Sequence, residues 1–92
     1  MRELVRYKMI FNGRVQGVGF RYKASYIADK YRLTGYVKNE YDGSVSMEVQ
    51  GTEQEIYMLI KELANDRIID IMDIAKERIP VDDDERGFIT QY

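Results

Sequence analysis

The residues between Gly13 and Arg21 are the ones whose types and spacing best suit a chemical role. They read Gly-Arg-Val-Gln-Gly-Val-Gly-Phe-Arg, with three glycines within seven residues and an arginine at the end. Glycines allow turns in which successive backbone N–H groups point inward, and a helix that begins after such a turn adds unpaired donors and a partial positive charge. The guanidinium of Arg21 matches the oxygens of a phosphate or a carboxylate. The segment therefore predicts an anion-binding loop.

The generic phosphate-loop patterns do not match this segment. No Gly-Lys-Ser/Thr follows the glycines, as a P-loop requires, and only Gly17-Val18-Gly19 has the spacing of the dinucleotide fingerprint. A tight connection between a strand and a helix, with Arg21 on the surface, explains the same residues. The physical reading of the segment alone leaves both interpretations open.

The whole segment resembles the signature of the acylphosphatase family, and a second stretch agrees with it. Gly35-Tyr36-Val37-Lys38-Asn39, followed by Asp42-Gly43-Ser44-Val45, is similar to the second block of that family, whose asparagine is catalytic. The two motifs stand in the family's order in a chain of the family's length. The resemblance covers nearly the whole chain and is sharpest from Gly13 to Val45.

This resemblance implies hydrolysis of the carboxyl–phosphate bond of acyl phosphates, with inorganic phosphate as product and inhibitor. Arg21 aligns with the family's substrate-holding arginine, and Asn39 aligns with its water-positioning asparagine. The implied phosphate site is formed by the backbone N–H groups of Gln16, Gly17, Val18, Gly19 and Phe20, with Arg21 facing the phosphate. No cofactor and no metal are implied.

The composition suits a reaction that needs no general acid. The chain has no histidine and no cysteine, so it lacks the commonest general base, a thiol nucleophile and cysteine metal ligands. The leaving group of an acyl phosphate is a carboxylate with a pKa of about 4, which departs without protonation. Phosphoryl transfer has a loose transition state, so positioning and charge stabilisation supply most of the catalysis. An asparagine that orients a water is enough for this substrate class, whereas the alkoxide leaving group of a phosphate monoester needs an acid.

Apolar periodicity predicts an α+β chain. Alternation predicts strands over residues 4–12, 34–39, 44–50, 68–79 and 88–92, and stripes at helical spacing predict helices over about 20–31 and 53–64. The alternation slips between Ile71 and Ile74, which indicates a β-bulge. Short connections and right-handed crossovers fold this order into a ferredoxin-like β-α-β-β-α-β sandwich, with an antiparallel sheet, two helices on one face and a short C-terminal strand.

Several local features follow from the same pattern. Thr52 to Glu55 form a capping box, and Asp42-Gly43 is a hairpin turn signal. Arg32 stands where the family usually has a helix-ending glycine, so a left-handed conformation costing roughly 1 kcal/mol is expected there. The alternating strand directions place Tyr92 at the same end of the sheet as Arg21. Its terminal carboxylate is then a candidate partner for that arginine, and a frayed terminus is the alternative.

Length and charge restrict the class of protein. Ninety-two residues predict a single domain over 1–92, and the net charge of −2 argues against a partner nucleic acid. No apolar run is long enough to cross a bilayer, and the charged segment 1–4 does not resemble a signal peptide. We therefore expect a cytoplasmic monomer that binds a small-molecule acyl phosphate, with no nucleic acid and no membrane partner.

The same residues allow other interpretations. A ferredoxin-like sheet can bind RNA through aromatic side chains on its central strands, but the open-face positions here, such as Lys8 and Ser46, are not aromatic. A non-catalytic anion-binding or regulatory domain would use the same loop without turnover. A third relation is the acylphosphatase-like domain of hydrogenase-maturation proteins, against which the chain length argues. The acidic run 82–85 is predicted to be a solvated loop rather than a metal site, and Tyr22, Tyr26, Tyr36 and Tyr41 are assigned to packing and surface.

Overall fold

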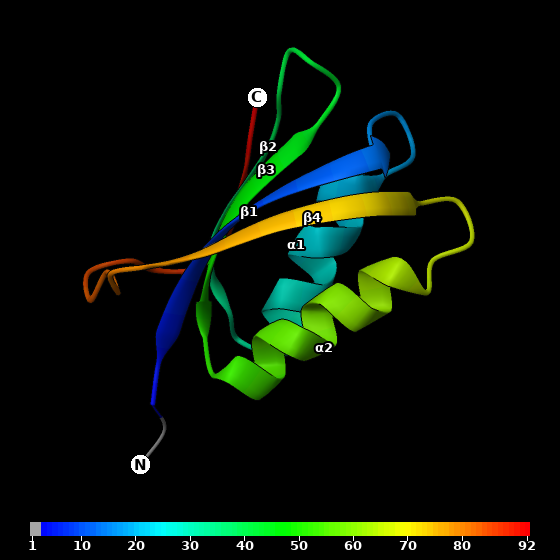
Figure 1. The fold of residues 1–92 in the computed structure, drawn as a ribbon. Coiled ribbons are helices and arrows are strands. Elements are labelled where there is room, and N and C mark those ends of the chain that lie inside the picture. The colour runs from blue at the N-terminus through cyan, green and yellow to red at the C-terminus, as the bar shows by residue number, and fades with distance from the viewer. Residues whose placement is uncertain (1–2) are drawn as a thin grey trace.

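The computed structural model describes residues 3–92, so the first two residues of the charged segment 1–4 lie outside it. The elements follow one another in the predicted order (Figure 1). They are β1 (Val5–Arg14), α1 (Phe20–Lys30), β2 (Thr34–Asn39), β3 (Val45–Gly51), α2 (Glu53–Ala64), β4 (Asp70–Ile79) and β5 (Phe88–Gln91). Neither helix in this part of the chain is long and apolar enough to cross a membrane.

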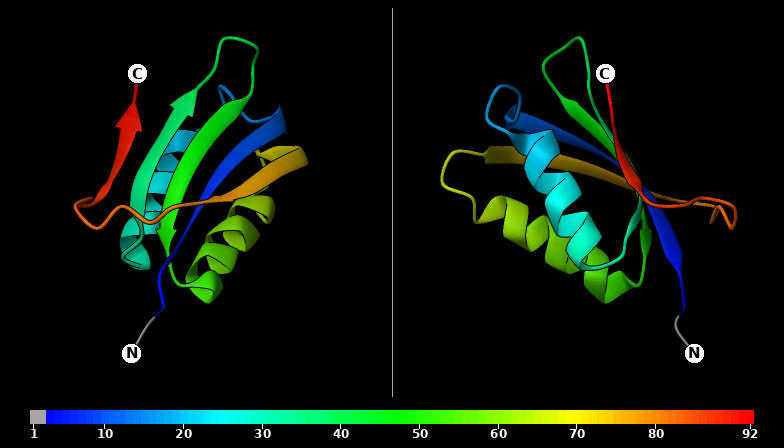
Figure 2. Two further views of the ribbon diagram at one scale, coloured as in Figure 1. Left: turned by 60° about the vertical axis from the view of Figure 1, so that its left-hand side comes forward. Right: turned by 180° about the vertical axis from the view of Figure 1, so that it is seen from behind.

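The five strands form one sheet in the order β4-β1-β3-β2-β5. Among β4, β1, β3 and β2, every neighbouring pair is antiparallel, as the sequence predicts. The C-terminal strand β5 instead pairs parallel with β2, which makes the complete sheet mixed. The left view of Figure 2 shows the sheet in front with both helices behind it, so α1 and α2 cover one face and leave the other open.

The core lies between the helices and the covered face of the sheet. Alternate residues of the strands point into it, and they meet the apolar stripes of α1 and α2. Its largest fully buried side chains are Phe11, Phe20, Met9, Leu33, Met47, Ile56, Leu59 and Leu63. The rings of Phe11 and Phe20 pack with their centroids 5.0 Å apart. This contact fixes the start of α1 against β1, and it therefore fixes both ends of the connecting loop.

The open face of the sheet is organised around Arg6, which is only 5% exposed. Its guanidinium donates to Glu85 at 2.6 Å and to Glu48 at 3.0 Å, and the bond to Glu85 is the main reason that the pKa of Arg6 is raised. Burial, aided by a hydrogen bond to Glu48, raises the pKa of Tyr36 to about 12. One residue of the acidic run thus has a structural partner. Within residues 3–92, no group of acidic side chains is arranged to hold a metal ion.

The local predictions hold at three positions. Arg32 has a φ of 58° and therefore adopts the expected left-handed conformation. Thr52 and Glu55 form the capping box of α2. The pairing of β1 with β4 shifts register between Asn12 and Gly13, opposite Asp73 and Ile71, so the predicted bulge is confirmed.

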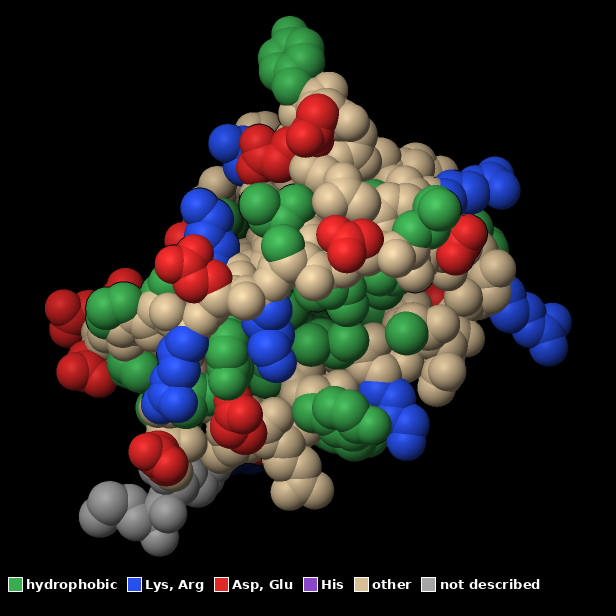
Figure 3. Space-filling model, in the orientation of Figure 1, with side chains coloured by type: hydrophobic (Ala, Val, Ile, Leu, Met, Phe, Trp, Pro, Cys, Tyr) green, Lys and Arg blue, Asp and Glu red, His purple; other side chains and the backbone are tan. Residues whose placement is uncertain are grey.

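The surface in the view of Figure 3 carries Lys and Arg side chains interspersed with Asp and Glu. A protein that tracks a nucleic acid backbone usually has a stripe of basic residues. The face in view has no such stripe among the described residues.

The C-terminus lies at the same end of the sheet as the loop after β1 and the β2–β3 hairpin (Figures 1 and 2).

Candidate active site

The loop between β1 and α1 presents free backbone donors. Gly17 and Gly19 have φ values of 73° and 78°, a region that costs glycine little, and Gly19 is the N-cap of α1. No side chain caps this end of α1 within the described residues, whereas the other helix has its capping box. The first N–H groups of a helix need partners from outside it. The start of α1 is therefore equipped to receive an anion.

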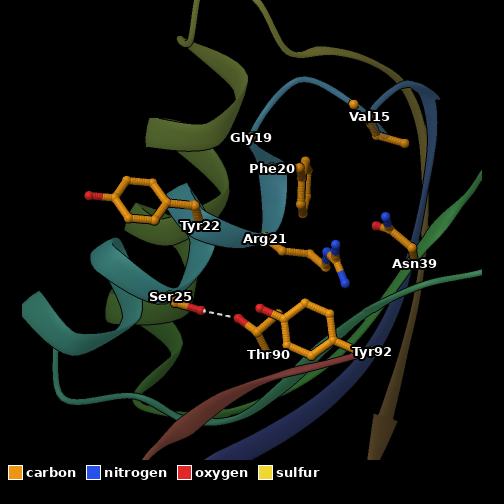
Figure 4. A pocket seen from close by; sticks show the side chains of 10 residues that line it. Val15, Gly19, Phe20, Arg21, Tyr22, Ser25, Asn39, Thr90 and Tyr92 are labelled. Carbon is orange, nitrogen blue, oxygen red and sulfur yellow. Dashed lines mark hydrogen bonds between the residues drawn. The ribbon is translucent and has the colours of Figure 1, made fainter.

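A pocket of about 300 Å³ opens beside this loop. Its lining comes from the loop, α1, the end of β2 and the C-terminal segment, and comprises Val15, Gly17, Gly19, Phe20, Arg21, Tyr22, Ser25, Asn39, Thr90 and Tyr92. Figure 4 shows the Arg21 guanidinium and the Asn39 amide facing each other across it. These two residues are 18 positions apart in the sequence, and the parallel directions of β1 and β2 bring them to one end of the sheet.

Arg21 is held by the C-terminal segment. Its Nη1 donates to the carbonyl oxygen of Gln91 at 3.0 Å, and its guanidinium carbon lies 4.8 Å from the centre of the Tyr92 ring. The predicted direction of the last strand is thus confirmed. The contacts differ from the expected one, because within residues 3–92 a carbonyl and a ring, rather than an ion pair with the terminal carboxylate, hold the arginine.

The Asn39 side chain is in a different situation. It is half-buried at the end of β2, and within residues 3–92 its amide forms no hydrogen bond. Its backbone position is fixed, because β2 pairs with β3 up to Asn39 and Val45. An amide that is held in place but unpaired can donate to one oxygen and accept from another. Asn39 is therefore suited to orienting a water.

The predicted phosphate-binding residues divide into two groups. Gly17, Gly19 and Phe20 line the pocket with Arg21, whereas Gln16 and Val18 do not. Val18 is buried in the core, and Gln16 donates from Nε2 to the carbonyl oxygens of Glu40 and Ser44 at 2.7 and 2.8 Å. Gln16 thus ties the loop to the hairpin that follows Asn39. The contribution of the Gln16 and Val18 backbone amides to phosphate binding stays a prediction.

Four residues that line the pocket were not predicted as site residues from the sequence: Val15, Tyr22, Ser25 and Thr90. Ser25 and Thr90 hydrogen-bond to each other at 2.9 Å. Tyr92, expected here as a partner of Arg21 through its carboxylate, contacts the arginine through its ring. Tyr22, which the sequence assigned to packing or surface, lies on the rim. Ser25 could have been found from its position four residues after Arg21 on the same face of a helix. Thr90 and Tyr92 come into the pocket only because β5 joins the edge of β2.

The fold and the site together define a class of protein: a ferredoxin-like α+β domain with a glycine-rich loop before an uncapped helix, and an arginine and an asparagine at the same end of its sheet. The family model "Acylphosphatase" matches residues 7–90. An acylphosphatase of Clostridium acetobutylicum is 41% identical over 88 residues, which are 95% of this chain and 97% of that protein. The chain belongs to the acylphosphatase family.

Solved structures agree with this assignment. The crystal structure of acylphosphatase from Bacillus subtilis superposes with a TM-score of 0.87 and 34% identity, over 96% of this chain and 99% of that one. A structure of full-length HypF in a phosphate- and nucleotide-bound form superposes with a TM-score of 0.88 and 29% identity. It covers all of this chain but 12% of the larger one. The same domain therefore also occurs as one part of a longer protein.

Proposed function

We propose that this chain hydrolyses the carboxyl–phosphate anhydride bond of acyl phosphates, giving a carboxylate and inorganic phosphate. The observation that carries the proposal is the pocket in which the uncapped start of α1, Arg21 and Asn39 face the same space. Membership in the acylphosphatase family supports it.

The residues divide the work as follows. The loop amides and Arg21 bind the phosphoryl oxygens, where charge-assisted hydrogen bonds are strongest. Asn39 holds a water in line with the bond to be broken. The water oxygen bonds to phosphorus as the bond from phosphorus to the acyl oxygen breaks, and that oxygen keeps the electron pair. The water's proton passes to a phosphate oxygen of the substrate, and the carboxylate leaves without needing an acid.

A direct test uses benzoyl phosphate and p-nitrophenyl phosphate side by side, each with and without excess chelator. The proposal expects release of phosphate from benzoyl phosphate in both conditions. The monoester should react more slowly, because its leaving group has a higher pKa than a carboxylic acid and the described residues that line the pocket include no Asp, Glu or His side chain to protonate it. Activity that disappears in chelator and returns with a divalent ion would contradict the metal-free mechanism.

The second candidate is a domain that binds a small anion without turning it over. The uncapped start of α1 and Arg21 would bind an anion in either case, so the two candidates differ only in turnover. Such a domain would bind phosphate yet leave benzoyl phosphate intact in the same assay. The cytoplasmic location, the monomeric state and the lack of a nucleic acid partner stay predictions.

A further inference from the structure

A second depression adjoins the phosphate pocket and shares a wall with it. It is a groove of about 340 Å³ between α1 and α2, lined by Tyr22, Lys23, Tyr26, Ile27, Glu62, Leu63 and Asp66. Tyr22 lines both the groove and the pocket that contains Arg21 and Asn39. The two spaces therefore adjoin at one side chain, Tyr22.

The groove has the chemistry of a site for an apolar group. Its floor is made by Ile27 and Leu63, which belong to the hydrophobic core. Its aromatic wall is formed by Tyr22 and Tyr26, which lie one helical turn apart on α1 and are 78% and 61% exposed. An apolar floor with a few polar groups at the edge is typical of small-molecule sites.

Charged groups at the edge of the groove are paired with one another. Nζ of Lys23 lies 2.7 Å from Asp66, and Glu62 accepts from Lys30 at 2.7 Å and from the hydroxyl of Tyr31. These ion pairs lower the pKa values of both carboxyl groups, which stay charged at neutral pH. An acyl group entering the groove would therefore meet the aromatic rings and the apolar floor rather than an unpaired charge.

The geometry of the reaction directs the acyl group toward this groove. The attacking water and the leaving oxygen lie roughly in line on opposite sides of phosphorus. Asn39, the proposed water ligand, is on one side of the pocket in Figure 4, and Tyr22 is on the other, with Phe20 and Arg21 between them. The Tyr22 ring extends away from Asn39. The leaving carboxylate and its substituent therefore point along that ring.

We infer that Tyr22 determines the acyl specificity of this enzyme, and that it favours apolar acyl groups larger than acetyl. The acyl substituent packs on the Tyr22 ring and lies over Ile27 and Leu63, with Tyr26 forming the far wall. This inference rests on the proposed function. It concerns the acyl group, which is the part of the substrate that the phosphate pocket does not select. A two-carbon acetyl group is too short to cover the ring, so it gains little from the groove.

The test compares kcat/KM for benzoyl phosphate and acetyl phosphate in the wild type, Tyr22→Ala and Tyr22→Phe. We expect the benzoyl-to-acetyl ratio to fall about fivefold in Tyr22→Ala, the value of one aromatic contact, and to be kept in Tyr22→Phe. Tyr57→Ala is the matched control, because Tyr57 is 60% exposed on α2 and lines neither space. Tyr22 is largely solvent-exposed, so its loss should not unfold the chain.

Each other result has a definite meaning. An unchanged ratio in Tyr22→Ala, or an equal loss with both substrates, would overturn the specificity role while leaving the proposed hydrolysis intact. A fall of the same size in Tyr57→Ala would also overturn it, because the effect would not belong to the groove. If the wild type hydrolysed neither substrate, the proposed function itself would fail, and the specificity inference would fail with it.

Discussion

Arg21 and Asn39 face the same pocket but are held in different ways. Arg21 has partners in the C-terminal segment, whereas the Asn39 amide is unpaired within residues 3–92. Arg21→Ala removes the charge that we propose meets the phosphate, so both binding and turnover should collapse. Asn39→Ala should lower kcat by roughly 100-fold or more while phosphate still binds. Steady-state kinetics and phosphate titration measure the two effects, and wild-type turnover in Asn39→Ala would refute the assigned role.

Gln16 is the residue that joins the two halves of the site. Its two bonds to the hairpin carbonyls fix the loop relative to the chain just after Asn39. Gln16→Ala should lower kcat by about tenfold through misplacement of the water, with phosphate affinity kept within about twofold. Gln54→Ala, at an exposed position of α2, serves as the control. A loss of melting temperature with unchanged kcat would restrict Gln16 to a structural role.

The sequence led to part of this site only. Arg21 and Asn39 could be found because each lies in a motif whose residues follow one another in the chain. Tyr22 could not, since an exposed tyrosine on a helix has the same local pattern whether or not a pocket lies beside it. Gln16 was identified, but its side-chain partners lie in the hairpin and depend on the sheet. Contacts between segments far apart in the chain depend on how the strands are arranged, so the spacing of residues along the sequence does not reveal them.

At the scale of elements, the strands and the bulge could be predicted because each depends on one local pattern. The alternation of apolar and polar residues predicts the strands, and the interruption of that alternation between Ile71 and Ile74 predicts the bulge in β4. The fold class predicted from the sequence, an antiparallel sheet with a short C-terminal strand, does not include the parallel pairing of β5 with β2, although the strand directions imply it. A four-residue strand has too few alternating positions to choose its neighbour. Its place depends on Phe88, which is buried against the core.

Two glycines show how differently elements tolerate a methyl group. A Cβ on Gly35 would lie 1.9 Å from the carbonyl oxygen of Glu48, at a φ of 138°, whereas Gly17 has a φ of 73° and nothing within 4 Å. We expect Gly17→Ala to cost about 1 kcal/mol of unfolding free energy, the strain of a left-handed residue. Gly35→Ala should cost about 3 kcal/mol or more, because β2 must move from β3. Urea unfolding of both variants checks this order, which equal losses would contradict.

At the scale of the whole molecule, we expect stability at alkaline pH to depend on Tyr36. Its pKa is raised to about 12, chiefly by burial, whereas an unfolded tyrosine titrates near pH 10. Below about pH 10 both states are protonated, and between about 10 and 12 the unfolded chain ionises first, so stability falls as pH rises. Tyr36→Phe should make the unfolding free energy fall less steeply with pH, as measured by urea unfolding at pH 9 to 11, whereas Tyr57→Phe should not.

In Tyr36→Phe, the dependence of the unfolding free energy on pH should become weaker but should not disappear. The pKa values of Tyr7 and Tyr31 are also raised, by hydrogen bonds to Glu53 and Glu62. Their ionisation acts in the same direction. An alkaline transition in Tyr36→Phe that coincides with the wild type would show that the half-buried Tyr36 hydroxyl does not control it.

The C-terminus connects the edge of the sheet to the site. Gln91 pairs with Lys38 of β2 and accepts from Arg21, and the Tyr92 ring covers the same guanidinium. A long arginine side chain loses rotamer entropy of about 2 kcal/mol when it is fixed, so partners that fix it before substrate arrives should improve binding. Tyr92→Ala removes the ring and keeps the carbonyl, while deletion of residues 91–92 removes both.

We expect the Michaelis constant to rise in steps along this series. The loss of an exposed cation–π contact should raise KM by about threefold in Tyr92→Ala. The deletion should raise KM by about tenfold and lower the melting temperature as well, because a hydrogen bond and the end of β5 are lost together. Tyr41→Ala, at the fully exposed tip of the hairpin, tests whether any lost surface tyrosine has the same effect. Wild-type kinetics in the deletion would mean that Arg21 reaches its working position without the C-terminal segment.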